Sequence, residues 1–124
     1  EYAISISNKL CNYSFLITSS IKNSINSNSF AVKSTLKTLN TYFDIILDDA
    51  SHFQHHQIQT LDIFLPYVKE GGIYIIEDID PANDQEGRLR EIATKHNYSM
   101  TWHDLRDLTP VRRFDNIMAV FIKS

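Results

Sequence analysis

Two short apolar runs that end in acids decide the fold: Tyr42-Phe-Asp-Ile-Ile-Leu-Asp-Asp49 and Ile73-Tyr-Ile-Ile-Glu-Asp78. Continuous apolar runs of this length are typical of strands buried on both faces, as in a parallel sheet. Between them, Ser51 is a fair N-cap for a helix, which Gly71-Gly72 would end. A strand, a helix and a second strand in this order predict neighbouring parallel strands.

The remaining sequence extends this alternation in both directions. Two strands are expected before the first run, followed by a helix, and a helix and two more strands are expected after the second. A hairpin with a long connection through Pro110 would close the domain. We therefore predict one α/β domain over residues 1–124, with a mostly parallel sheet and a C-terminal antiparallel hairpin. The flanking elements are expected over Glu1–Ser7, Asn12–Ile21, Phe30–Leu39, Asp84–His96, Tyr98–Leu105 and Asn116–Lys123.

Composition excludes several classes of function. The net charge of −3 gives no electrostatic basis for binding nucleic acid or an anionic membrane. Cys11 is the only cysteine, so neither an internal disulfide nor a thiolate zinc site can form. No apolar run approaches the roughly 20 residues needed to cross a bilayer, and no signal peptide is recognisable. We expect a cytoplasmic protein.

Acidic side chains gather where the two central strands end. Ligands of open parallel sheets bind beyond the carboxyl ends of the strands, where Asp49, Glu77 and Asp78 would meet. Like charges in such a cluster require a cation or raised pKa values. Oxygen ligands favour magnesium, calcium or manganese over zinc, so these three acids are the predicted metal ligands. His52 would face the same edge, where its imidazole could remove a proton near neutral pH.

Simpler interpretations of the same residues stay open. Acids at the ends of parallel strands are common, often as N-caps of the next helix. His55 and His56 lie in the first turn after the strand, where one could contact a substrate and at least one is expected to be exposed. Arg112 and Arg113 could hold an anionic group, although a solvated loop is the default.

Four segments together resemble a known family: Phe43-Asp-Ile-Ile-Leu-Asp-Asp-Ala-Ser-His52, His56-Gln57, Leu65-Pro66 and Gly71-Gly-Ile-Tyr-Ile-Ile-Glu-Asp78. They are similar to the fourth and fifth strand region of class I methyltransferases. More narrowly, they resemble metal-dependent O-methyltransferases that act on macrolide sugars, and the related cephalosporin hydroxylase-like group. The likeness covers residues 42 to 79 and extends to the terminal hairpin.

The resemblance implies a chemistry as well as a fold. It implies S-adenosylmethionine (SAM) as methyl donor, Mg²⁺ or another hard divalent cation, and a small-molecule hydroxyl acceptor, often on a sugar. Asp49, Glu77 and Asp78 match the family's metal-binding positions, and His52 matches its proposed base. The bound metal would hold and acidify the acceptor hydroxyl.

The sequence departs from the family in the half that binds SAM. The glycine-rich loop after the first strand is absent, since the only glycines are Gly71, Gly72 and Gly87. If Tyr2–Ser7 is the family's second strand, Ser5 and Ser7 stand where an acid would bind the ribose hydroxyls, and we expect them to take that role. An alternative function is then a degenerate methyltransferase-like domain that no longer binds SAM and serves as an interaction module. A metal-dependent hydrolase is a third option, although no Gly-x-Ser-x-Gly motif is present.

A missing first strand would also leave a gap at the centre of the sheet, with unpaired backbone groups. Three arrangements could close it. The chain could be a fragment of a longer protein, a second copy could supply the strand in a homodimer, or Tyr2–Ser7 could move into the central position. We expect dimerisation or rearrangement.

Overall fold

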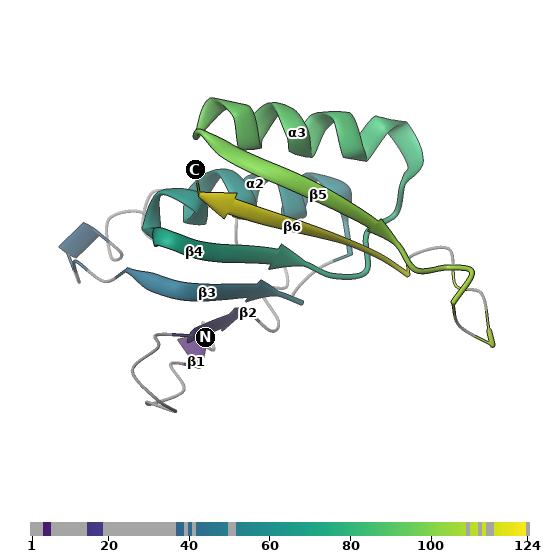
Figure 1. Cartoon of the computed structure of the whole chain (residues 1–124), viewed down its shortest axis with the longest axis horizontal. Helices are drawn as coiled ribbons and strands as arrows, with labels where there is room; N and C mark the ends of the chain where they lie inside the picture. The colour runs from purple at the N-terminus through teal and green to yellow at the C-terminus, as the bar shows by residue number, and fades with distance from the viewer. Residues whose placement is uncertain are drawn as a thin grey trace.

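The computed structural model describes residues 4–5, 15–18, 37–38, 40, 42–49, 52–108, 110–111, 113 and 116–123. In this part of the chain six strands form one sheet, in the order β1-β2-β3-β4-β6-β5 (Figure 1). The strands are β1 (Ile4–Ser5), β2 (Phe15–Thr18), β3 (Phe43–Asp48), β4 (Val68–Ile76), β5 (Tyr98–Asp104) and β6 (Ile117–Lys123). The helices are α2 (Gln54–Phe64) and α3 (Gln85–Lys95), with short 3-10 turns η1 (Leu65–Tyr67) and η2 (Ala82–Asp84).

The directions of the strands confirm the predicted fold class. Strands β2, β3 and β4 are parallel neighbours, with Leu47 paired to Ile75 across the centre. Strand β6 runs antiparallel to both β4 and β5, which is the predicted terminal hairpin. Parallel neighbours bring their carboxyl ends to one edge, so the ends of β3 and β4 lie side by side.

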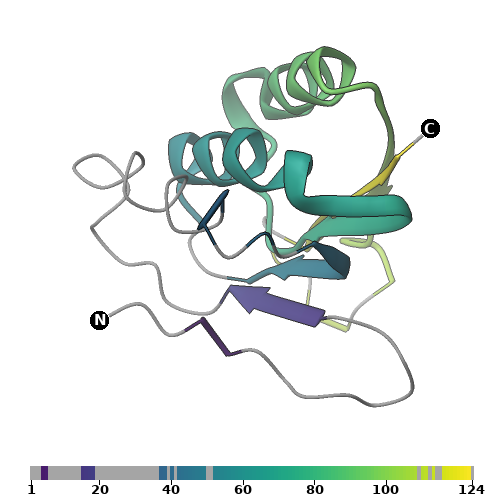
Figure 2. The ribbon, with the colours of Figure 1, turned by 90° about the vertical axis from the view of Figure 1, so that its left-hand side faces the viewer.

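Both described helices lie on the same side of the sheet, as Figure 2 shows. Between them and the strands is an apolar core, and β4 buries alternate residues from Gly72 to Ile76 against it. Tyr74 is fully buried there, and its ring meets Phe121 of β6 edge-on with centroids 6.0 Å apart. The helices contribute Leu61, Leu89 and Ala93 to the same core. The packing holds β3 and β4 rigidly where they meet the predicted site.

The helix after β3 ends earlier than the sequence predicted. It stops at Phe64, because Pro66 cannot donate a backbone hydrogen bond and the chain turns through η1 instead. The two glycines lie inside β4, so the prediction that they end the helix is wrong. They belong to a bulge, since pairing shifts between Phe43 and Ile45 and Gly71 has φ of +71°. The helix begins after Phe53, whose side chain makes no capping bond, so Ser51 is not the N-cap and itself lies outside the described residues.

The central position beside β3 is occupied by β2. Phe15 to Thr18 pair in parallel with Ile45 to Asp48, so of the three arrangements considered, the one in which Tyr2–Ser7 moves into this position is wrong. Instead, Ile4 and Ser5 pair antiparallel with β2 on its far side. The apolar run Phe15-Leu16-Ile17 is better suited than the shorter β1 to a place between two strands. Of the helix expected over Phe30–Leu39, only Lys37 and Thr38 are described, and both are helical.

None of the helices in the described ranges combines the length and the apolar character that a membrane crossing requires.

Candidate functional site

Consecutive aspartates at the end of β3 face opposite ways. Asp48 is 3% exposed and accepts a hydrogen bond of 2.8 Å from the buried Tyr74 hydroxyl. Asp49 follows the last strand residue and is exposed. Because side chains alternate along a strand, one of the two acids enters the core and the other reaches the carboxyl edge. Burial and the neighbouring Asp48 carboxylate raise the pKa of Tyr74 well above its ordinary value, so its hydroxyl remains a donor.

Three of the predicted site residues meet at that edge. Asp49, His52 and Asp78 each offer one ligand atom, and these atoms all lie within 4.8 Å of one another. Within this group, His52 Nε2 lies 3.7 Å from Asp78 Oδ2. The His52 side chain is half exposed and that of Asp78 about a third exposed, so the group is open to solvent. The structure thus brings together residues from the ends of β3 and β4, as the sequence predicted.

Glu77 lies beside this group but not within it. The Glu77 side chain is half-buried, and its carboxylate is not part of the cluster of Asp49, His52 and Asp78. Burial raises the pKa of Glu77, and the nearby charges of Asp49 and Asp78 raise it further. Like charges that perturb one another in this way are relieved by a bound cation.

The chemistry of the donors fits a divalent cation. Two carboxylates converge with an imidazole, and a third carboxylate is close enough to be perturbed by them. Carboxylate oxygens suit Mg²⁺, Mn²⁺ and Ca²⁺, and a nitrogen donor is compatible with Mn²⁺ and zinc. Among the described residues, no lysine or arginine forms an ion pair with any of these acids.

The backbone that carries Asp78 is unusual. Asp78 has φ of +51°, in the left-handed region that few residues other than glycine adopt. On either side, the Glu77 amide donates to Asp48 O at 3.2 Å and the Ile79 amide donates to Ile117 O at 3.1 Å. The turn after β4 is therefore bonded to both neighbouring strands, and it directs Asp78 back toward β3.

Three glutamines also support this turn, and sequence reasoning missed them. Gln57 Nε2 donates to the carbonyls of both Glu77 and Asp78, at 3.4 Å each. Gln85 Nε2 donates to Gln57 Oε1, and Gln54 Nε2 donates to the carbonyl of Asp80. Gln54 and Gln57 are three residues apart, which places them on one face of α2, but nothing in the sequence pairs them with a turn more than 20 residues away.

The other predicted residues lie around the site or outside the described ranges. His55 is exposed and packs against the half-buried His56, with ring centroids 4.1 Å apart and the ring planes tilted by 57°. Burial lowers the pKa of His56, and the neighbouring His55 lowers it further. Arg113 is exposed, and Arg112 is outside the described residues.

Of the two proposed cofactor contacts only Ser5 is described, and its strand β1 lies at the edge of the sheet, separated from β3 by β2. Ser5 belongs to β1 and pairs with Ile17 of β2, whereas Ser7 is outside the described residues. The family's second strand would run parallel to its neighbour, but β1 runs antiparallel.

Similar curated proteins are sugar and macrolide O-methyltransferases. Over 37 residues the chain is 43% identical to demethylmacrocin O-methyltransferase of Streptomyces fradiae, which covers 30% of this chain and 9% of that protein. It is also 43% identical over 37 residues to mycinamicin VI 2''-O-methyltransferase of Micromonospora griseorubida, again with 30% of this chain and 9% of the relative covered. The matched region is thus a small part of these enzymes. No protein-family model matches the chain.

Similar solved structures extend the likeness to most of the chain. The O-methyltransferase TomG from Streptomyces achromogenes, in complex with SAM, matches 77% of this chain and 47% of its own, with a TM-score of 0.53 and 13% identity. The methyltransferase MycE in complex with Mg, SAH and mycinamycin VI matches 83% of this chain and 30% of its own, with a TM-score of 0.51 and 18% identity. The fold is that of the class I SAM-dependent methyltransferases.

The likeness to O-methyltransferases and to their fold confirms the resemblance predicted from the sequence. At such identities the structural likeness shows the fold alone. The methyltransferase fold is present in part, because the chain spans less than half of TomG and about a third of MycE.

Proposed function

We propose that this chain carries the metal-binding and proton-accepting part of a SAM-dependent O-methyltransferase. Its acceptor is a hydroxyl of a sugar or another small molecule, and its setting is the cytoplasm. The observation that carries the proposal is the convergence of Asp49, His52 and Asp78 at the carboxyl ends of β3 and β4. Ligands of open parallel sheets bind at that edge.

Asp49, Glu77 and Asp78 would hold Mg²⁺ or another hard divalent cation. Such a cation, when bound, would hold the acceptor hydroxyl and lower its pKa. The three carboxylates come from two adjacent strand ends, so the sheet fixes their separation. Their mutual repulsion, expressed in the raised pKa of Glu77, would be relieved on binding.

His52 is the proposed general base. A neutral imidazole has one nitrogen that can accept a proton, and its unperturbed pKa suits neutral conditions. The acceptor oxygen would attack the methyl carbon of SAM as the carbon–sulfur bond breaks, and the hydroxyl proton would pass to His52. Asp78 Oδ2, 3.7 Å from Nε2, would stabilise the imidazolium that results. Since methyl transfer needs an in-line approach, alignment of the acceptor should supply much of the rate.

Ser5 and Ser7 remain the proposed contacts for the ribose hydroxyls of SAM. A serine hydroxyl can donate or accept a hydrogen bond, although it lacks the charge of the acid expected at this position. The proposal requires β1 to approach the cofactor from its antiparallel place beside β2.

The alternative is a methyltransferase-like domain that does not bind SAM. One observation favours it: β2 occupies the central position, yet the residues after it contain no glycine before Gly71. A close backbone approach to a ligand normally requires glycine at that turn. Such a domain would act through interaction with other chains, including a second copy of itself.

Calorimetric titration of the full chain with Mn²⁺, Mg²⁺ and SAM separates the two functions. The proposal predicts cation binding that Asp49→Asn abolishes, while Glu91→Gln, an exposed acid on α3, leaves it unchanged. It also predicts SAM binding, followed by cation-dependent transfer of labelled methyl to macrolide glycosides that His52→Ala eliminates. Cation binding without SAM binding would favour the alternative, and no binding of either would refute the proposed metal site.

A further inference from the structure

Two buried glutamines lie directly behind the metal-site turn. Gln57 of α2 is 2% exposed and Gln85, the first residue of α3, is fully buried. Burying a primary amide is unfavourable unless its polar groups are hydrogen-bonded. The bonds that these amides make therefore indicate what they are positioned to hold.

Their bonds lead to the backbone of the turn. Gln57 Nε2 is shared between the carbonyls of Glu77 and Asp78, which follow β4. Gln54 Nε2 continues this support along the turn, because it donates to the carbonyls of Asp80 at 3.1 Å and Ala82 at 2.5 Å. Side-chain amides of α2 thus bond to most of the carbonyls between the end of β4 and η2.

Gln85 fixes the orientation of Gln57. Its Nε2 donates to Gln57 Oε1 at 3.3 Å and to the backbone carbonyl of Gln54 at 3.1 Å. With its oxygen occupied in this way, Gln57 must present its NH₂ group to the turn. A reversed Gln57 amide would place an oxygen against two carbonyls and a nitrogen against a donor. We call Gln54, Gln57 and Gln85 the glutamine cluster.

The segment that these glutamines hold contains a non-glycine residue with a positive φ. Asp78 has φ of +51°, and the turn around it is bonded on one side to β3 and β6 and on the other to the glutamine cluster. A backbone fixed at successive carbonyls and amides also fixes the direction of the side chain between them. That direction brings the Asp78 carboxylate to Asp49 and His52.

We infer that Gln57 is a positioning residue: it sets the conformation of the Glu77–Asp80 turn that presents Asp78, and Gln85 acts through it. The inference deepens the proposed function and rests on it for the identity of the bound cation. Replacing a residue that is hydrogen-bonded to a metal ligand and orients it weakens metal affinity by about 10- to 100-fold.

The test compares isosteric variants of the full chain. Gln57→Met retains the volume and removes every hydrogen bond, Gln85→Met removes only the orienting partner, and Thr60→Val is the control. Thr60 is buried on the same helix, so its variant disturbs α2 to a similar degree without a hydrogen-bonding contact to the turn. Two quantities are measured: the Mn²⁺ dissociation constant by calorimetry and, without metal, hydrogen exchange of the Ile79 amide, which bonds to Ile117 O.

We expect Gln57→Met to raise the dissociation constant about tenfold and to accelerate Ile79 exchange by about tenfold. Gln85→Met should shift both in the same direction by roughly threefold, and the double variant should resemble Gln57→Met alone because Gln85 acts through Gln57. Thr60→Val should leave both within about twofold of the wild type.

Each result decides the inference separately from the proposed function. If the wild-type chain binds no Mn²⁺, the metal proposal fails, and the exchange rate of Ile79 alone decides whether Gln57 holds the turn. Unchanged exchange in Gln57→Met overturns the inference. Faster exchange with unchanged Mn²⁺ affinity overturns the positioning role. Should Gln57→Met fail to fold, Gln85→Met decides by the same two measurements.

Discussion

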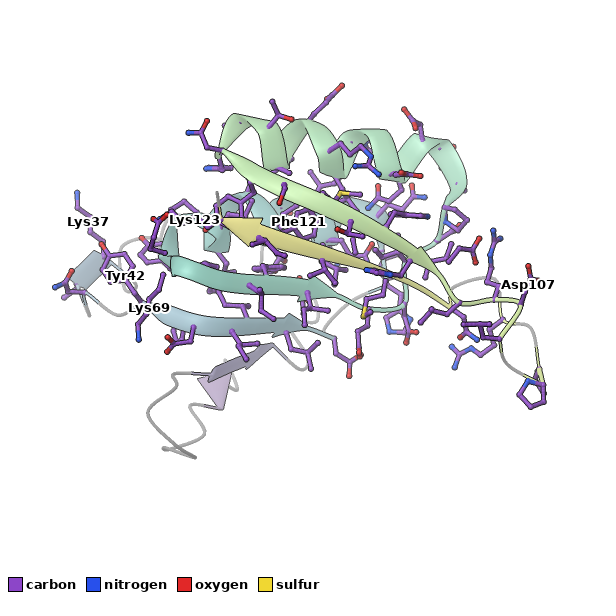
Figure 3. All side chains as sticks on the ribbon, viewed as in Figure 1. Lys37, Tyr42, Lys69, Asp107, Phe121 and Lys123 are labelled. Carbon is purple, nitrogen blue, oxygen red and sulfur yellow. The ribbon has the colours of Figure 1, made fainter. Side chains whose placement is uncertain are left out.

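Acidic side chains have different partners at the two ends of strands β3 and β4. At their amino ends, Lys69 Nζ lies 2.8 Å from Asp44 Oδ2, so the acid is neutralised within the fold. At their carboxyl ends, Asp49 and Asp78 face each other and His52, with no lysine or arginine of the described residues paired to them. Figure 3 shows Lys69 near Tyr42 at one end of the molecule and Asp107 at the other. One pair of strands therefore carries an amino edge whose acid is paired with a lysine, and a carboxyl edge where two acids converge with a histidine.

The two edges also differ in how well their residues are packed. The amino edge is closed by packing as well as charge: the Tyr42 and Tyr67 rings are 6.3 Å apart, and the bulge brings Gly72 against the backbone of β3. At the carboxyl edge, burial raises the pKa of Glu77 and the nearby charges of Asp49 and Asp78 raise it further, so ionising Glu77 costs free energy. Functional sites commonly carry such costs, which the rest of the fold must offset.

The largest expected loss of stability follows from a substitution at the amino edge, Gly72→Ala. In Gly72→Ala the new Cβ would lie 2.8 Å from Asp44 O and 2.9 Å from Lys69 O, and backbone atoms cannot easily move aside. We expect a loss of about 3 kcal/mol in the free energy of unfolding, measured by urea titration. The neighbouring Gly71→Ala is the matched control, since its Cβ would meet open space and only the φ of +71° opposes it. That cost should be about 1–2 kcal/mol, so equal losses would contradict the close packing proposed for this edge.

The next largest loss of stability is expected where the core meets the carboxyl edge. Tyr74→Phe removes the hydroxyl that donates to Asp48, whose carboxylate is 3% exposed. Loss of that donor should cost about 1–3 kcal/mol of unfolding free energy, because a buried acceptor loses a partner. Tyr42→Phe, which removes a hydroxyl from a ring that is 47% exposed, should change stability by less than about 0.5 kcal/mol. A tolerated Tyr74→Phe would mean that Asp48 does not depend on this bond.

Asp48 and Asp49 illustrate how far the sequence could predict the site. Because two strands end in acids, the sequence predicted metal ligands at the carboxyl edge. Asp49, His52 and Asp78 do converge there. Alternation along a strand requires Asp48 and Asp49 to face opposite sides. It does not say which of them enters the core, because that depends on a hydrogen bond to Tyr74, 26 residues away.

The features that the sequence did not predict depend on contacts between distant segments. Gln57 and Gln85 look like ordinary polar helix residues, yet packing of α2 against α3 buries both. The apolar Phe15–Thr18 strand was predicted, but its place beside β3 follows from competition among strands for one position. In the same way, Gly71-Gly72 is a typical helix end in sequence, whereas Pro66 had already ended the helix.

Removing one acid from each edge should change the melting temperature in opposite directions. Without metal, Asp78→Asn should raise the melting temperature, because it removes one of the repelling charges and asparagine tolerates a positive φ. Asp44→Asn should lower it slightly, since a partly exposed ion pair contributes about 0–1 kcal/mol. Thermal unfolding in EDTA measures both. With saturating Mn²⁺ the order should reverse, because binding stabilises the wild type and not Asp78→Asn. Shifts of the same sign in EDTA would remove the distinction between the two edges.

The smallest effect is a pH dependence in which two acids act in opposite directions. Burial and the charges of Asp49 and Asp78 raise the pKa of Glu77 above its ordinary 4.5, so the folded chain binds this proton more tightly than the unfolded chain does. Stability should therefore increase as the pH falls from neutrality through the folded pKa of Glu77, and Glu77→Gln should remove that increase.

Asp62 of α2 provides the opposite case on the helical layer. Burial would raise its pKa, but hydrogen bonds from Lys95, the last residue of α3, and from His96, which follows it, lower the pKa overall from 3.8; they are 2.8 and 2.7 Å long. Its contribution to stability is present above 3.8 and is lost as the pH falls through the folded value. Melting temperatures in EDTA should place Glu77→Gln above the wild type and Asp62→Asn below it at pH values above about 4.5. The deficit of Asp62→Asn should shrink as the pH falls below about 4. Parallel curves for Glu77→Gln and the wild type would show that the acids at the carboxyl edge do not repel one another, and the need for a cation there would disappear.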